Sequence, residues 1–159
     1  MSILYHKMTL KTILLLSTGI LGVFLGTQLA EAALIVPYWK GLSPDVFFTF
    51  YKTYGNELHQ FYSPMTIAAT IFPVIALVWN LLTKQKIDLL MWIMVVFTLL
   101  FFSTYFLYFK EANLSFTERT ITNEILPYKL TEWANWHWGR ISCETVAFVC
   151  GLILLTKLK

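Results

Sequence analysis

The residues best suited to chemistry lie in the stretch EWANWHWGRISCE, residues 132–144, where the last apolar run of the chain begins. His137, Arg140 and Glu144 follow one another at spacings of three and four, so on a helix they share one face. An imidazole exchanges protons near neutral pH, and a guanidinium stabilises a developing oxyanion. This face therefore predicts acid–base chemistry.

Two further ionisable groups are expected to join this face. Glu31 lies near the end of the first apolar run and has no cation on the same expected helix, so it must be protonated, reach Arg140 or a histidine, or bind a ligand. His59 lies just before the second apolar run. We predict that His137 or His59 is the base, that Arg140 stabilises an oxyanion, and that Glu31 and Glu144 set protonation states.

Other interpretations of the same residues stay open. Arg140 and Glu144 could form a structural ion pair that lets the last helix insert into the membrane. The two histidines and two glutamates could instead bind a transition metal, iron, copper or zinc, through Glu31, His59, His137 and Glu144, although the chain has no HxxxH or ExxH pair. The cofactor is therefore unknown: none, or one of these metals.

The elements that must position these groups are membrane-spanning helices. Hydrophobic residues make up 57% of the 159-residue chain and charged residues only 13%, which is outside the usual balance of soluble proteins. Four apolar runs, residues 12–36, 61–82, 89–109 and 136–156, each reach the roughly 20 residues that cross a bilayer. The sequence predicts one domain, 1–159, an all-α integral membrane four-helix bundle. Two longer outer connections, 37–60 and 110–135, are also expected, the first with a short interfacial helix.

The lysines indicate the orientation of the bundle. Six cations flank the spans on one side, and Asp88 is the one acidic residue among them. These cations are Lys7, Lys11, Lys84, Lys86, Lys157 and Lys159. We therefore expect both termini in the cytoplasm and the protein in a cytoplasmic or inner membrane. Alternating spans then bring the polar helix ends together in one outward-facing pocket.

Aromatic and amide side chains cluster at the same outer ends. An interfacial belt is the ordinary explanation for such tryptophans. The alternative is that some of them line a hollow for a flat apolar substrate such as a polycyclic phenol or a quinone. The residues predicted to bind it are Asn56, Tyr105, Asn113, Trp133 and Trp136.

Four short segments, LIVPYW, YGNELHQFYSP, FKEAN and HWGR, together with the tryptophan that precedes the last, resemble the anthrone-oxygenase-like family of small four-span membrane proteins. The resemblance implies oxygenation of anthrones to anthraquinones without an established metal or flavin. The positions that match are Asn56, Pro64, Asn113, Trp133, His137 and Arg140. Glu31, His59 and Glu144 have no counterpart in the family pattern.

Three functions follow as hypotheses. The first is a membrane oxidoreductase, an anthrone-oxygenase-like monooxygenase or hydroxylase acting on a lipophilic aromatic substrate. The second is a metal-dependent membrane enzyme, and the third a non-enzymatic transport or assembly subunit; the scarcity of polar groups in the inner halves of the spans argues against a polar path through the bundle. The expected partners are the lipid bilayer and a lipophilic small molecule, with no nucleic acid, and assembly into a homo-oligomer is compatible with the sequence.

Overall fold

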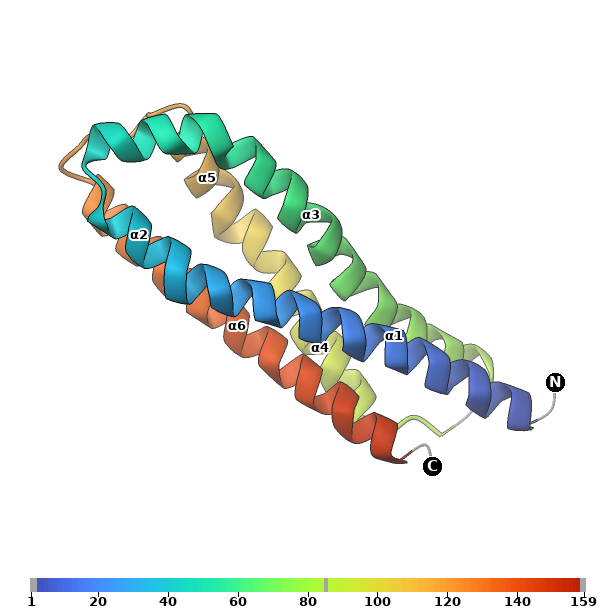
Figure 1. The fold of residues 1–159 in the computed structure, drawn as a ribbon. Helices are drawn as coiled ribbons and strands as arrows, with labels where there is room; N and C mark the ends of the chain where they lie inside the picture. The colour runs from blue at the N-terminus through green and yellow to red at the C-terminus, as the bar shows by residue number, and fades with distance from the viewer. Residues whose placement is uncertain (1–2, 85, 158–159) are drawn as a thin grey trace.

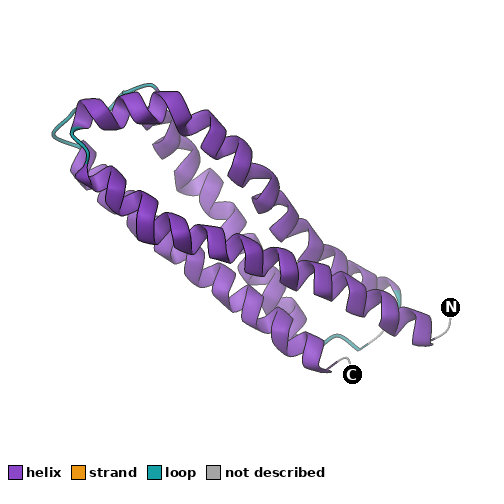
Figure 2. Ribbon diagram, viewed as in Figure 1, coloured by secondary structure: helices purple, strands orange, loops and turns teal. Residues whose placement is uncertain are grey.

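The computed structural model of the chain describes residues 3–84 and 86–157, which form long helices joined by short loops (Figure 1; Figure 2). The chain makes four helical arms. They are α1 Ile3–Ala30 continued by the π-helical segment η1 Glu31–Ile35 and by α2 Val36–Gly41; α3 Pro44–Leu82; α4 Leu89–Thr104 continued by the π-helical segment η2 Tyr105–Phe109 and by α5 Lys110–Thr117; and α6 Leu126–Lys157. The predicted four-helix bundle is confirmed.

The arms form a closed ring of neighbours. α1 packs against α3 and α6, and α4 packs against the same two helices from the other side. Both ends of the chain lie at the end of the bundle that also holds the 83–88 turn, whereas the 118–125 connection lies at the opposite end (Figure 1). Successive arms are therefore antiparallel, as the alternation of spans predicts.

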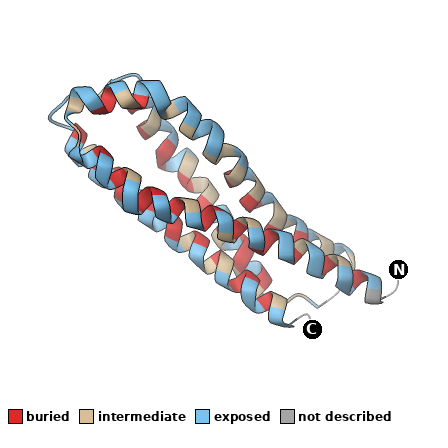
Figure 3. Cartoon of the chain, viewed as in Figure 1, coloured by how far each residue is buried: buried red, intermediate tan, exposed pale blue. Residues whose placement is uncertain are grey.

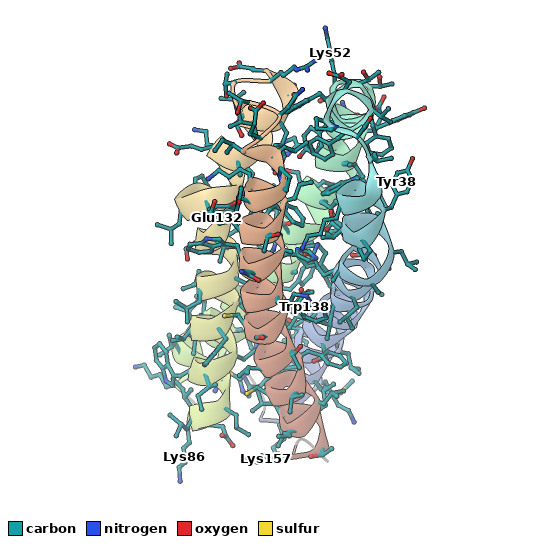
Figure 4. All side chains as sticks on the ribbon, turned by 90° about the vertical axis from the view of Figure 1, so that its left-hand side faces the viewer. Tyr38, Lys52, Lys86, Glu132, Trp138 and Lys157 are labelled. Carbon is teal, nitrogen blue, oxygen red and sulfur yellow. The ribbon has the colours of Figure 1, made fainter. Side chains whose placement is uncertain are left out.

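All four arms are long and apolar enough to cross a membrane, which supports an integral membrane protein. The 39 residues of α3 correspond to roughly 58 Å of helix, well beyond the ~30 Å of hydrocarbon. Each predicted span lies within one of these arms, and each arm is longer than its predicted span. Lys52 lies at one end of the bundle and Lys86 and Lys157 at the other (Figure 4); Lys159 falls outside the described residues.

The outer connections are more helical than the sequence predicts. The expected interfacial helix is the first part of α3, residues 110–117 continue the third arm, and α6 already begins at Leu126. Only residues 42–43 and 118–125 remain as outer loops. Pro44 occupies the first turn of α3, where its missing N–H costs little.

An aromatic cluster explains this extra helix. We call it the aromatic cap: Trp39, Phe47, Phe48, Tyr51, Phe109, Phe116 and Trp133 are all buried, although they lie near the outer ends of the arms. Phe47 and Phe116 meet edge to face, with ring centroids 5.2 Å apart. Buried aromatic area of this kind stabilises helices that local propensity would leave as loops.

The inner half of the bundle is a separate apolar core. Leu14, Leu21, Phe24, Met94 and Phe101 are fully buried there, at 0% exposure. Buried residues face the bundle axis along each arm, and exposed residues face outward (Figure 3). The site described next lies between this core and the aromatic cap.

Candidate active site

A cavity of about 570 Å³ lies between the four arms, below the aromatic cap. All four arms contribute to its wall. Of the residues predicted from the sequence, eight line it: Glu31, Asn56, His59, Tyr105, Asn113, Trp133, His137 and Arg140. The structure therefore places most of the predicted site around one space.

The inner wall of the cavity brings together an acid and an imidazole from opposite ends of the chain. His137 Nε2 lies 3.0 Å from the backbone carbonyl oxygen of Gln28 and 3.8 Å from Oε2 of Glu31. A carbonyl oxygen can only accept a hydrogen bond, so Nε2 carries the proton and donates it to Gln28. His137 is thereby fixed between α1 and α6.

Further contacts hold the His137 ring in place. It stacks on the Trp133 indole, with centroids 4.9 Å apart, and meets the Phe109 ring edge to face at 6.5 Å. Its Nδ1 atom is buried and has no hydrogen-bond partner among the described residues. Because Nε2 is committed to Gln28 and Nδ1 is covered, neither ring nitrogen is free to accept a proton from a molecule in the cavity.

The Arg140 guanidinium is the buried cation of the site. Its Nη2 donates a hydrogen bond of 2.9 Å to Thr66 Oγ1 on α3. The Cζ atom lies 5.4 Å from the ring centroid of Phe24, 5.8 Å from that of Phe101 and 5.5 Å from that of Phe109, within the range of cation–π attraction. Three rings and one hydroxyl thus hold a positive charge beside the cavity.

Glu31 completes this group. It begins the π-helical segment η1, lies within electrostatic reach of Arg140, and shares a hydrogen bond with the Tyr62 side chain. The Glu31 side chain is 7% exposed and lines the cavity. It is the one carboxylate in the cavity wall.

Glu144, predicted to share the pocket, is not among the residues that line the cavity wall. The side chain is 0% exposed, and neither carboxylate oxygen has a hydrogen-bond partner among the described residues. The spacing of four suggests that Glu144 pairs with Arg140. The two groups interact electrostatically but form no hydrogen bond, because the guanidinium donates to Thr66 of the neighbouring helix instead.

Three further predicted residues, Asn113, His59 and Trp136, lie around the cavity or outside it. Asn113 Oδ1 accepts a hydrogen bond of 2.9 Å from Trp133 Nε1, so this pair ties the third arm to α6 above the cavity. His59 is exposed and stacks on Tyr105, with centroids 6.1 Å apart, at the edge of the cavity. Trp136 does not line the cavity; it stacks on Tyr108 at 5.1 Å on the outside of α6.

The four predicted metal ligands are not gathered at one point. Across residues 3–84 and 86–157, no group of three or more His, Cys, Asp or Glu side chains is close enough to hold a metal ion. His59 lies at the exposed edge of the cavity, and Glu144 lies outside its wall. Glu31 and His137 alone remain together.

Sequence reasoning missed several residues of the wall, chiefly Tyr62, Thr66 and Phe109. A signal for two of them was present, because Tyr62 and Thr66 continue the spacing of three and four from His59 along α3. Phe109 ends the π-helical segment η2, and nothing in the sequence marks such a segment. Both π-helical segments supply residues to the cavity, as is frequent at functional sites.

No family model, curated protein or solved structure matches the chain. The resemblance to anthrone-oxygenase-like proteins therefore stays a prediction from four short segments. What the chain does must be inferred from the chemistry of the cavity.

Proposed function

We propose that the protein is a membrane-embedded oxygenase that acts on a flat, lipophilic phenol or a related anthrone or quinone-like substrate. The observation that carries this proposal is that the buried Glu31 and Arg140 both line the wall of one aromatic cavity, within electrostatic reach of each other. The site offers a proton acceptor and an oxyanion-stabilising cation to one bound molecule.

The shape and lining of the cavity suit such a substrate. Its volume of about 570 Å³ falls in the range typical of small-molecule sites. Trp39, Tyr62, Phe109 and Trp133 supply aromatic faces and edges on which a fused ring system can stack. Glu31, Thr66, His137 and Arg140 are the polar groups of the inner wall, and they would orient the oxygen of the ring toward Arg140.

In this proposal Glu31, rather than a histidine, takes the proton. His137 donates from Nε2 to Gln28 and lies beside the carboxylate, so it positions Glu31. Glu31 removes a proton from an acidic C–H or O–H of the substrate, and Arg140 stabilises the negative charge that develops on the ring oxygen. Electrostatic stabilisation is strong here because the site is largely shielded from water.

The overall reaction balances with dioxygen as the oxidant. In an anthrone, the deprotonated ring carbon gives electrons to O₂; one oxygen atom becomes the new carbonyl, and the other leaves as water with the two hydrogens lost from the carbon. In a phenol oxidised to the quinone, one of these two hydrogens comes from the ring carbon and the other from the hydroxyl. The protein residues hold the substrate, accept the first proton and return it to the departing oxygen. The resemblance to anthrone-oxygenase-like proteins supports this reaction class.

We also propose an orientation for the site. Lys84, Lys86 and Lys157 lie at the end of the bundle that holds both chain termini, and lysine favours the cytoplasmic side. Both termini would then be cytoplasmic, in a cytoplasmic or inner membrane. The cavity would lie close to the opposite, outer membrane surface.

The test uses the full chain in lipid nanodiscs with 1,8-dihydroxyanthrone as the substrate. Oxygen uptake and formation of the anthraquinone should exceed the background of empty nanodiscs, and Glu31→Gln should return the rate to that background. A wild-type rate equal to that of empty nanodiscs would overturn the proposal for this substrate class. Binding without turnover would favour a non-enzymatic lipid-binding protein.

A further inference from the structure

We propose that the cavity opens sideways into the bilayer, between α3 and the third arm, and that the substrate carries a hydrocarbon tail that remains in this opening. The inference rests on the proposed function and names the form of its substrate. We call the opening the portal; Ile67 and Phe106 form its apolar edge, and His59 and Lys110 form its polar edge.

The exposure of the lining residues locates the portal. Cavity residues from α1 and α6 are covered: Gln28 and His137 are each 1% exposed. Cavity residues from α3 and the third arm are open: Ile67 is 47%, Phe106 60% and Leu114 52% exposed. Ile67, Phe106 and Leu114 line the cavity and also reach the outer surface of the protein, so the cavity is open between these two arms.

The packing of the arms explains why the opening lies there. α3 packs against α4 nearer the inner end and against α5 nearer the outer end, and η2 lies between these two helices in the chain. The His59 and Tyr105 rings stack across this seam, with an angle of 26° between their planes. A ring contact between the exposed His59 and the half-buried Tyr105 can separate at far lower cost than an interlocked helix interface.

The portal is graded in polarity in the direction of the membrane normal. Ile67 belongs to the apolar segment 61–82, so it faces lipid chains, whereas Lys110 follows the apolar segment 89–109 and falls at the membrane surface. His59 lies outside the apolar segment of α3, on the same side as Lys110. A ring in the cavity could therefore keep its oxygen on Arg140 while a tail leaves over Ile67 and Phe106 among the acyl chains.

A tailed aromatic ring is the occupant that fits both ends of this path. A purely polar ligand could pass the polar edge of the portal but would leave its apolar edge and the aromatic walls without a partner, and a lipid with two chains attached to a phosphate would bring no ring for these walls. An isoprenoid-tailed phenol or quinone satisfies the cation, the stacking surfaces and the lipid-facing opening together.

The experiment compares two ligands with one ring: 2-methyl-1,4-naphthoquinone and the same ring bearing a four-unit isoprenoid chain. Binding to the full chain in nanodiscs is followed by quenching of tryptophan fluorescence. Ile67→Trp narrows the portal, and Ile71→Trp is the matched control, because Ile71 is also 47% exposed on α3 but does not line the cavity.

We expect Ile67→Trp to raise the Kd of the tailed quinone about tenfold, because the new indole blocks the path of the tail. The Kd of the tailless quinone should change by less than about twofold. Ile71→Trp should bind both ligands as the wild type does. A second variant, Phe106→Trp, with Leu99→Trp as its control, should repeat the pattern from the opposite edge. Leu99 is 47% exposed and outside the cavity wall.

The outcomes separate the two proposals. Wild-type affinity for both quinones in both portal variants, or equal weakening of both quinones, overturns the portal while leaving the cavity as a ring-binding site. If the wild type binds neither quinone, the portal inference is overturned, whereas the proposed function is decided separately by turnover of 1,8-dihydroxyanthrone.

Discussion

The Nε2 atom of His137 lies 3.8 Å from Oε2 of Glu31, and both side chains are buried between α1 and α6. The two residues are more than a hundred positions apart in the sequence, yet they form the centre of the site. The Nε2 proton is donated to the Gln28 carbonyl, so the histidine is fixed as a donor beside the carboxylate. In the proposed function, Glu31 transfers the proton and His137 positions it.

Glu31→Gln should abolish proton transfer while preserving the shape of the side chain. We expect oxygenation of 1,8-dihydroxyanthrone to fall by a factor on the order of 10²–10⁴, the usual contribution of a general base. Glu57→Gln is the control, because Glu57 is an exposed carboxylate of α3 outside the cavity wall. Equal rates for Glu31→Gln and the wild type would remove Glu31 from the mechanism.

Arg140→Met should raise the Kd of acidic phenols. The guanidinium would no longer stabilise the ring oxygen, and a hydrogen bond to a charged group contributes about 1.5–3 kcal/mol, or roughly 10- to 100-fold in Kd. Arg140→Lys should restore little, because an ammonium cannot reproduce the planar fork that bonds Thr66 and faces three rings. Isothermal titration with 1,8-dihydroxyanthraquinone measures the difference; unchanged affinity in Arg140→Met would contradict this role.

His137→Phe tests the positioning role. The variant keeps a stacking ring but leaves the Gln28 carbonyl without its donor, which should cost about 1–3 kcal/mol of stability. His137→Gln retains an N–H donor and should recover part of that loss. Thermal unfolding in nanodiscs measures the stability of each variant.

If His137 acts only through Glu31, the pH dependence of turnover should also shift in His137→Phe, whereas a purely structural residue would change stability alone. The same pH profile in the two proteins, at reduced stability, would reject the positioning role.

The inner end of the bundle has its own pH-dependent contact. The Lys157 ammonium donates a 2.6 Å hydrogen bond to Asp88 Oδ2, and the Leu90 backbone N–H donates to Oδ1 at 3.0 Å. These two donors, the lysine first, lower the pKa of Asp88 below its usual value. A lowered pKa in the folded state means that the contact stabilises the fold above the ordinary aspartate pKa and is lost as pH falls through the lowered value.

Asp88→Asn should therefore reduce stability at neutral pH by about 0.2–1 kcal/mol, since the ion pair is partly exposed. The difference from wild type should shrink as the pH falls below the ordinary aspartate pKa and the native carboxyl begins to take up a proton. Unfolding midpoints at pH 7 and pH 3 test this. A difference that is the same at both pH values would show that the ion pair contributes nothing.

The orientation can be tested by cysteine labelling in intact bacterial cells. With Cys143 and Cys150 replaced by serine, a cysteine at Glu124 in the 118–125 loop should react with a membrane-impermeant maleimide, and a cysteine at Lys86 should react only after lysis. Both positions are exposed. The reverse pattern would place the termini and the lysine-rich end outside.

The sequence by itself determined how many helices cross the membrane and which of their ends carry polar groups. Runs of about 20 apolar residues have no alternative to the helix in lipid, because each backbone group must be satisfied within the segment. Alternating spans then gather Glu31, His137 and Arg140 at one level. These conclusions need only residue type and spacing.

Only the tertiary structure decided which of the polar side chains share the cavity. Spacing places Arg140 and Glu144 on one face, but Arg140 lines the cavity, whereas Glu144, one turn further along α6, is buried outside its wall. Trp133 lines the cavity and Trp136 does not. The π-helical segments and the aromatic cap depend on contacts between arms, so the extended outer helices and the portal could not be predicted from spacing along one chain.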